Sequence, residues 1–168
     1  MKLVGALLLV AAACAIGHLQ AARREQRVRL LAGLIGAMDL LESHIVYGRT
    51  LLAEALWRVG EQRADVGSLF LEAARLMEGG LAFSKAWRKA LSAWSWGTAL
   101  TAGDVRPLRD LGDVLGRSPA DDQARHLRWV KSQLHAGWHD AREKLPELTR
   151  LYRALGVCGG LILALLLY

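Results

Sequence analysis

Charged residues are confined to the middle of this 168-residue chain, and this segregation limits its fold more than any other feature. Residues 1–22 contain one charged side chain, Lys2, and residues 154–168 contain none. The net charge of the chain is +6, so +5 remains for the segment between the ends. A chain of this length forms one domain. The pattern therefore predicts an apolar segment at 1–22, a basic middle at 23–153 and a second apolar segment at 154–168.

The first apolar segment has the length of a transmembrane helix, since about 20 residues of helix cross the hydrocarbon core. Arg23 and Arg24 follow it directly, and arginines next to a span favour the cytoplasmic side. The alternative is a secretory signal that ends near Cys14 and produces an exported lipoprotein. The apolar run continues past Cys14, however, and the arginines oppose translocation. We expect residues 1–22 to be an N-terminal transmembrane helix with a cytoplasmic segment after it.

The second apolar segment, residues 154–168, is shorter and gives about 22 Å of helix. It is predicted to be a C-terminal transmembrane helix if Arg153 reaches the interface, and a shallow membrane-embedded tail otherwise. Basic residues precede it, so both anchors place their positive flanks on the same side. Small residues four apart would let the anchors pack on each other, on partner membrane proteins or in a homo-oligomer. These residues are Ala13, Gly17 and Ala21 in the first anchor, and Gly156, Gly160 and Ala164 in the second.

Apolar residues of the middle recur at three- and four-residue spacing, and no segment alternates as a strand does. The helix of the first anchor is expected to continue to Ile45. Further helices are predicted at 51–59, 66–78, 85–96 and 104–115. Their expected caps and stops are Thr50, Gly60, Gly79, Ser84, Asp104 and Gly116. Within 85–96, Trp87, Leu91 and Trp94 share one face, which predicts a buried aromatic stripe.

The last helix of the middle has the clearest start, because Ser118 can cap it and Pro119 fits its first position. It should run to Leu145, where Pro146 kinks or interrupts it before the tail. The fold class is therefore all-α, a bundle of five to six helices between an N-terminal and a C-terminal transmembrane helix.

No pattern for chemistry emerges, and we predict no catalytic residue, cofactor or metal. A phosphate-binding loop is absent from the sequence. His135 and His139 stand four apart and could hold a metal in a metal-dependent enzyme, but no third ligand is evident. Asp122 and His126 are placed to pair across one helical turn. The basic excess suits an anionic membrane surface or an acidic partner, and it lacks the sharp stripe that nucleic acid requires.

Four strings in order carry a resemblance that covers the whole chain. They are Glu42 with Tyr47-Gly48, Thr50 and Glu54-Ala55-Leu56; Ala86-Trp87 with Ala90-Leu91; Leu115-Gly116 with Ser118, Asp122-Gln123 and His126-Leu127; and Leu151-Tyr152-Arg153-Ala154-Leu155-Gly156 with Gly160-Leu161. In this order they resemble the stage III sporulation protein AB family of endospore-forming bacteria. Leu51 stands where the family usually has proline, and Pro119 replaces its usual acidic residue.

The resemblance implies a non-catalytic platform in the channel complex between mother cell and forespore. The family is similar to inner-membrane platform proteins of type II secretion and type IV pilus machines, whose helical cytoplasmic domains face an ATPase. It implies a place in the mother-cell membrane around the forespore, with the stage III sporulation ATPase AA and other membrane proteins of the complex as partners. The candidate contacts are Glu54, Asp122, Gln123 and His126. A platform of a secretion or pilus system outside sporulation is the alternative.

Overall fold

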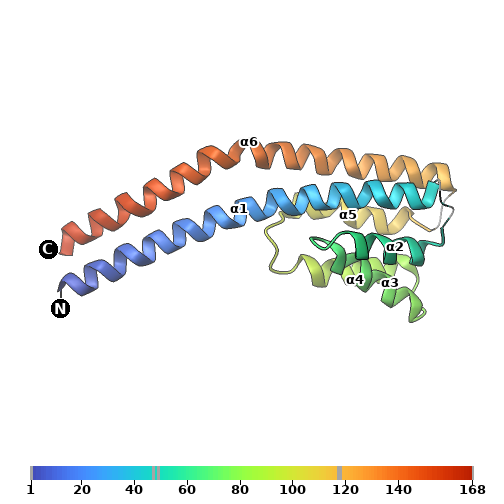
Figure 1. Ribbon diagram of the computed structural model, residues 1–168, viewed down its shortest axis with the longest axis horizontal. Helices are drawn as coiled ribbons and strands as arrows, with labels where there is room; N and C mark the ends of the chain where they lie inside the picture. Colours follow the sequence, from blue (N-terminus) through green and yellow to red (C-terminus); the bar gives the residue numbers. More distant parts are fainter. Residues whose placement is uncertain (1, 47, 49, 117–118, 168) are drawn as a thin grey trace. The chain divides into compact units, whose positions relative to one another are not determined.

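The computed structural model describes the backbone of residues 2–46, 48, 50–116 and 119–167, and the side chains of residues 15, 17–45, 48, 50–116, 119 and 121–144. Over this part of the chain the protein is all-α, with six helices and no strand. The predicted class is therefore confirmed. The helices, drawn in Figure 1, are α1 (Lys2–Val46), α2 (Leu52–Gln62), α3 (Gly67–Glu78), α4 (Phe83–Ser95), α5 (Ala102–Val114) and α6 (Ala120–Leu167).

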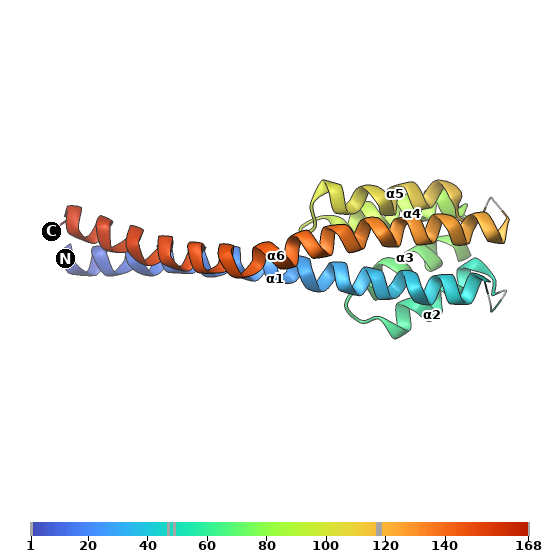
Figure 2. The ribbon, with the colours of Figure 1, turned by 90° about the horizontal axis from the view of Figure 1, so that it is seen from above.

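The chain divides into two compact units. Unit 1 comprises Met1–Gln26 and Asp140–Tyr168, and unit 2 comprises Arg27–His139. Unit 1 is built from the first part of α1 and the last part of α6, which lie side by side in both Figure 1 and Figure 2. Unit 2 holds the remainder of these two helices together with α2 to α5. Both long helices therefore belong to both units.

No helix contains a stretch long and apolar enough to cross a membrane among the residues that the structure describes. Most of the two expected anchors, 1–22 and 154–168, lies outside the residues whose side chains are described. The prediction of flanking transmembrane helices therefore receives no support from the fold.

In unit 2, the buried residues of α1 and α6 recur every three or four positions along each helix. That spacing places side chains on one face of each helix, which is then buried against its neighbours. The residues are Leu31, Leu34, Met38 and Leu41 of α1, and Leu127, Val130 and Leu134 of α6, each no more than 1% exposed. The two helices thus contribute matching apolar stripes.

Trp87 organises the remainder of the core. Its side chain is fully buried and its Nε1 donates a hydrogen bond to the carbonyl oxygen of Leu108 at 2.5 Å, so α4 is tied to α5. The ring centroids of Phe70 and Phe83 lie 5.5 and 5.7 Å from that of Trp87. The predicted aromatic stripe is confirmed at Trp87 and Leu91, whereas Trp94 is only half-buried.

Four expected helix boundaries are wrong: Thr50, Gly60, Ser84 and Asp104. Asp104 does not start α5, which begins at Ala102 with Thr101 as its N-cap. Gly60 does not stop α2, which continues to Gln62. A Cβ on Gly60 would lie 2.6 Å from Cγ of Leu71, and a Cβ on Gly67 would lie 2.2 Å from the Gly60 carbonyl oxygen. These glycines let α2 and α3 approach closely. Ser84 does not cap α4, because the helix already begins at the buried residue Phe83 and its N-cap is Ala82.

Of the two outcomes predicted at Pro146, the interruption is wrong, because α6 is unbroken from Ala120 to Leu167, and the kink stays a prediction. A proline removes one backbone hydrogen bond, and a helix can continue past that loss. Thr50 precedes the N-cap of α2, which is Leu51. The expected stops after α3 and α5 are confirmed, since Gly79 is the C-cap of α3 and Gly116 follows α5 with a φ of +77°. The expected cap Ser118 lies outside the described residues.

Candidate functional site

Two of the four residues singled out from sequence, Glu54 and Asp122, are exposed carboxylates in the first turns of α2 and α6. Each is paired with an arginine of its own helix. Arg58 Nη2 lies 2.7 Å from Glu54 Oε1, and Arg125 Nη2 lies 3.2 Å from Asp122 Oδ1. The predicted pairing of Asp122 with His126 is wrong, because the arginine one residue earlier takes the carboxylate.

The other two residues of that set, Gln123 and His126, lie near the start of α6. Gln123 Oε1 accepts a hydrogen bond from the backbone N–H of Gly116 at 3.4 Å and so links α6 to the end of α5. The His126 ring stacks on Trp129 with centroids 5.3 Å apart. Its Nε2 is buried without a hydrogen-bond partner among the described residues. Within the described part of the chain, three of the four residues therefore have local roles in their own helices.

His135 and His139, the metal candidates, are both exposed on α6. No group of three or more His, Cys, Asp or Glu side chains is placed to hold a metal ion within the described part of the chain. Of the expected anchor-packing residues, Gly17 and Ala21 are buried on α1. Residues Ala13, Gly156, Gly160 and Ala164 lie outside the part of the chain whose side-chain surroundings are described.

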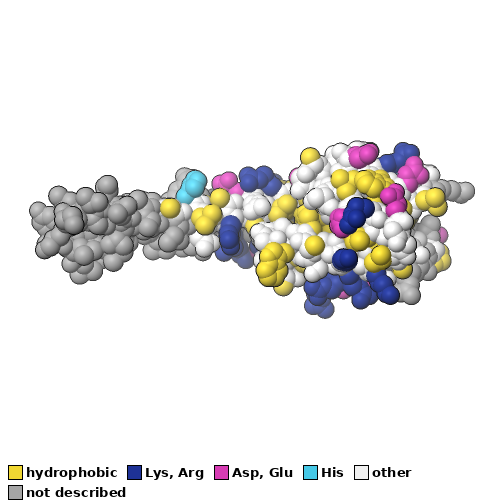
Figure 3. All heavy atoms as spheres, turned by 90° about the horizontal axis from the view of Figure 1, so that it is seen from below, with side chains coloured by type: hydrophobic (Ala, Val, Ile, Leu, Met, Phe, Trp, Pro, Cys, Tyr) yellow, Lys and Arg dark blue, Asp and Glu magenta, His cyan; other side chains and the backbone are white. Residues whose placement is uncertain are grey.

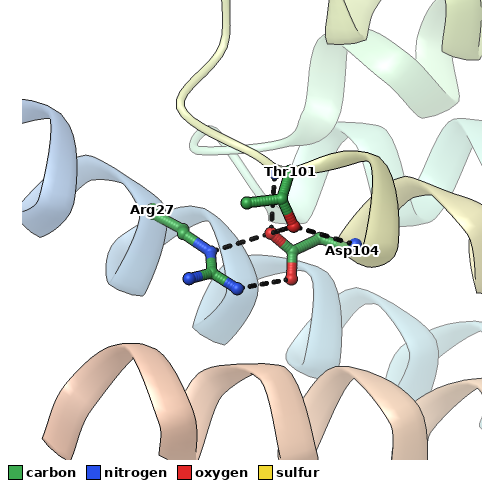
Figure 4. Close-up of polar contacts among 3 residues, drawn as sticks. All are labelled: Arg27, Thr101 and Asp104. Atoms are coloured by element: carbon green, nitrogen blue, oxygen red, sulfur yellow. Dashed lines mark hydrogen bonds and ion pairs between the residues drawn. The ribbon is translucent and has the colours of Figure 1, made fainter. Parts of the chain in front are cut away.

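A buried polar cluster joins α1 to the start of α5, and sequence reasoning missed it (Figure 4). Arg27 Nε and Nη2 donate to the two carboxylate oxygens of Asp104 at 2.8 and 2.9 Å. The Thr101 backbone N–H and hydroxyl both donate to Oδ2 of Asp104 at 2.8 Å. The Asp104 N–H donates back to the Thr101 hydroxyl, which completes a capping box.

Burial and hydrogen bonding change the pKa of Asp104 in opposite directions, and its side chain is 4% exposed. Burial alone would raise the pKa of this carboxyl, but the hydrogen bonds from Arg27 and Thr101 outweigh it and hold the pKa below its usual value. The carboxylate therefore stays ionised beside the guanidinium. Gly137 of α6 passes so close that a Cβ there would lie 3.0 Å from Asp104 Oδ1. The cluster thus fixes α1, α5 and α6 at one point of unit 2.

A second polar link joins α1 and α6 directly. Lys131 Nζ lies 2.7 Å from Asp39 Oδ1 and 3.3 Å from Glu42 Oε2. Its hydrogen bond with Asp39 raises the pKa of Lys131, burial opposes that change, and the bond with Glu42 adds to it. The link sets the register of the two helices because one ammonium contacts carboxylates one turn apart on α1.

The described residues also form a shallow recess between α4 and α5, with a volume of about 250 Å³. Arg88, Leu91, Ser92 and Ser95 of α4 line it together with Val105 and Arg109 of α5. Arg88 Nη2 lies 2.6 Å from Asp113 Oδ1, and that pair is more than half exposed. Arg109 is exposed and makes no hydrogen bond or ion pair with another described residue. The recess therefore combines cationic, hydroxyl and apolar side chains in its lining.

The geometry defines an all-α helical-bundle protein whose polar clusters tie helices together. A sequence model described as stage III sporulation protein AB matches residues 2–168. The stage III sporulation protein AB of Bacillus subtilis (strain 168) is 30% identical over 170 residues, covering 99% of each chain. A solved structure of a stage III sporulation protein AB has a TM-score of 0.66 and 27% identity, and it covers 71% of this chain and 96% of its own. The chain belongs to the stage III sporulation protein AB family, and this membership supports a role in sporulation.

Proposed function

We propose that the protein is a non-catalytic platform of the stage III sporulation channel complex between mother cell and forespore. Residues 1–22 and 154–168 anchor it in the mother-cell membrane around the forespore, and the bundle lies in the cytoplasm. There it engages the stage III sporulation ATPase AA and works with the other membrane proteins of the complex. It catalyses no reaction itself and binds no nucleic acid.

The observation that carries this proposal is the continuity of α1 and α6. With 45 and 48 residues, these helices are about 68 and 72 Å long. Helix α1 runs unbroken from the apolar N-terminal segment into the bundle, and α6 runs unbroken from the bundle into the apolar C-terminal segment. The Asp104 cluster and the Lys131 link hold both helices in the bundle. A displacement imposed on the bundle would pass along these two unbroken helices, as a platform requires.

Flotation of lipid vesicles tests both parts of the proposal. The full chain is reconstituted in vesicles and mixed with the purified ATPase, and the floated fraction is analysed for both proteins. We expect the chain to float and to bring the ATPase with it, whereas the ATPase stays at the bottom with empty vesicles. A chain that floats without the ATPase contradicts the engagement, and a chain that fails to float contradicts the anchors.

A further inference from the structure

The recess between α4 and α5 has the composition of a carboxylate-binding site. Its lining includes two arginines, Arg88 and Arg109, and two serines, Ser92 and Ser95. Guanidinium groups present forked N–H donors that match a carboxylate in two parallel hydrogen bonds. Arg88 already donates one hydrogen bond to the exposed Asp113 carboxylate, from Nη2 to Oδ1 at 2.6 Å.

The surroundings of the recess are basic. Helix α4 carries Lys85, Arg88 and Lys89 and no acidic residue, whereas α5 also carries Asp110 and Asp113, so the bases are in excess. Arg106 joins Arg109 on α5, and both are exposed. Figure 3 shows Lys and Arg side chains gathered along one edge of a face of unit 2, with apolar side chains beside them. A ligand that enters the recess is therefore attracted by several charges besides the two that line it.

The apolar parts of the recess distinguish a peptide from a simple anion. Leu91 and Val105 line it together with the polar groups, so an occupant that combines an apolar stem with a carboxylate is matched at both ends. Trp96 follows Ser95 directly and is 89% exposed. Tryptophan and arginine are the residue types that most often dominate the binding energy of protein interfaces. Inorganic phosphate would leave both apolar surfaces unused.

We propose that this recess binds an acidic segment of a partner protein, with a Glu or Asp side chain between Arg109 and Ser92 and an apolar neighbour against Trp96. The inference rests on the proposed platform function, because it assigns the chemistry of a docking point on the bundle. Arg109 carries the recognition, since Arg88 is already paired with Asp113.

The test uses the full chain in a zwitterionic detergent and a short fluorescein-labelled peptide of alternating Glu and Leu. A peptide with Gln in place of Glu is the ligand control, and anisotropy reports binding. We expect the Glu peptide to bind and the Gln peptide not to bind. Arg109→Gln should weaken binding by about tenfold or more, because a charge-assisted hydrogen bond is lost. Arg109→Lys should restore part of the affinity, since the charge remains without the fork.

Arg58→Gln is the matched control variant, because Arg58 is an exposed arginine on α2 and lies outside the recess. It should bind the Glu peptide as the wild type does. Equal losses in Arg58→Gln and Arg109→Gln would show attraction by net charge alone and overturn the site. Binding of anionic phosphatidylglycerol vesicles that Arg109→Gln weakens, without binding of the peptide, would also overturn it in favour of a lipid surface.

Failure of this inference is separable from failure of the platform function. If the wild type does not bind the Glu peptide but still floats the ATPase with vesicles, the recess is wrong and the platform stands. If the peptide binds through Arg109 but the ATPase does not float, the recess stands and the engagement with that ATPase is wrong.

Discussion

Removal of the Asp104 carboxylate is the sharpest perturbation of the bundle. Asp104→Ala deletes the acceptor of four hydrogen bonds, two from Arg27 and two from Thr101. It also removes the carboxylate that is paired with the guanidinium of Arg27, which is only 12% exposed. Breaking a buried ion pair in this way costs about 3–5 kcal/mol. That is a large share of the roughly 5–15 kcal/mol that stabilises a domain, so the variant should unfold far more readily.

Urea unfolding of the full chain in a mild detergent, followed by helical circular dichroism, measures the loss. Glu54→Ala is the matched control, because Arg58 and Glu54 are also 2.7 Å apart but are 53% and 50% exposed. Removing an exposed pair costs no more than about 1 kcal/mol. In the double variant Arg27→Met, Asp104→Leu, most of the lost stability should return because no buried charge remains. Equal small losses in Asp104→Ala and Glu54→Ala would refute the reasoning.

Four further predictions follow from local geometry. Thr101→Ala should lower the free energy of unfolding by about 1 kcal/mol through loss of the helix cap, and an unchanged urea midpoint would argue against it. Gly67→Ala should lower it by roughly 1–3 kcal/mol, because the new Cβ meets a backbone oxygen at 2.2 Å; unaltered stability would mean that α2 and α3 separate freely. The pKa of Asp104 is lower in the fold than its ordinary value of 3.8, so its contribution is complete above that value and lost as the pH falls through the folded pKa. The stability gap between wild type and Asp104→Asn should therefore shrink in acid, and a gap that widens would contradict this sign. Seven glycines inserted after Ala22 should impair sporulation more than seven alanines, which keep two helical turns; equal spore counts would argue against rigid coupling.

Helix class and several boundaries were predictable because they depend on local periodicity. The spacing of Leu31, Leu34 and Met38 identifies one face of α1 without knowledge of its partner. Gly79 and Gly116 likewise mark helix ends from sequence alone. Gly60 is also a glycine but does not end a helix. The absence of a side chain there makes room for α3 instead. Nothing within α2 reveals that neighbour.

The functional geometry was less accessible to sequence reasoning. Thr101 and Asp104 fit the spacing of a capping box, and that signal could have been found. Their third partner, Arg27, lies 77 residues from Asp104 and is brought near only by packing. Arg88 and Arg109 come from different helices for the same reason. Asp122 was expected to pair with His126 four residues on, whereas it pairs with Arg125 three residues on, and helical spacing alone allows either partner.

The topology of the bundle tests the central claim most directly. Ser68 is exposed on α3, so Ser68→Cys in a Cys14→Ser, Cys158→Ser background gives one accessible thiol within unit 2. Sporulating cells are treated with a membrane-impermeant thiol reagent before and after lysis. A platform with a cytoplasmic bundle predicts labelling only after lysis. Labelling of intact cells would contradict the account and favour an exported protein attached through Cys14.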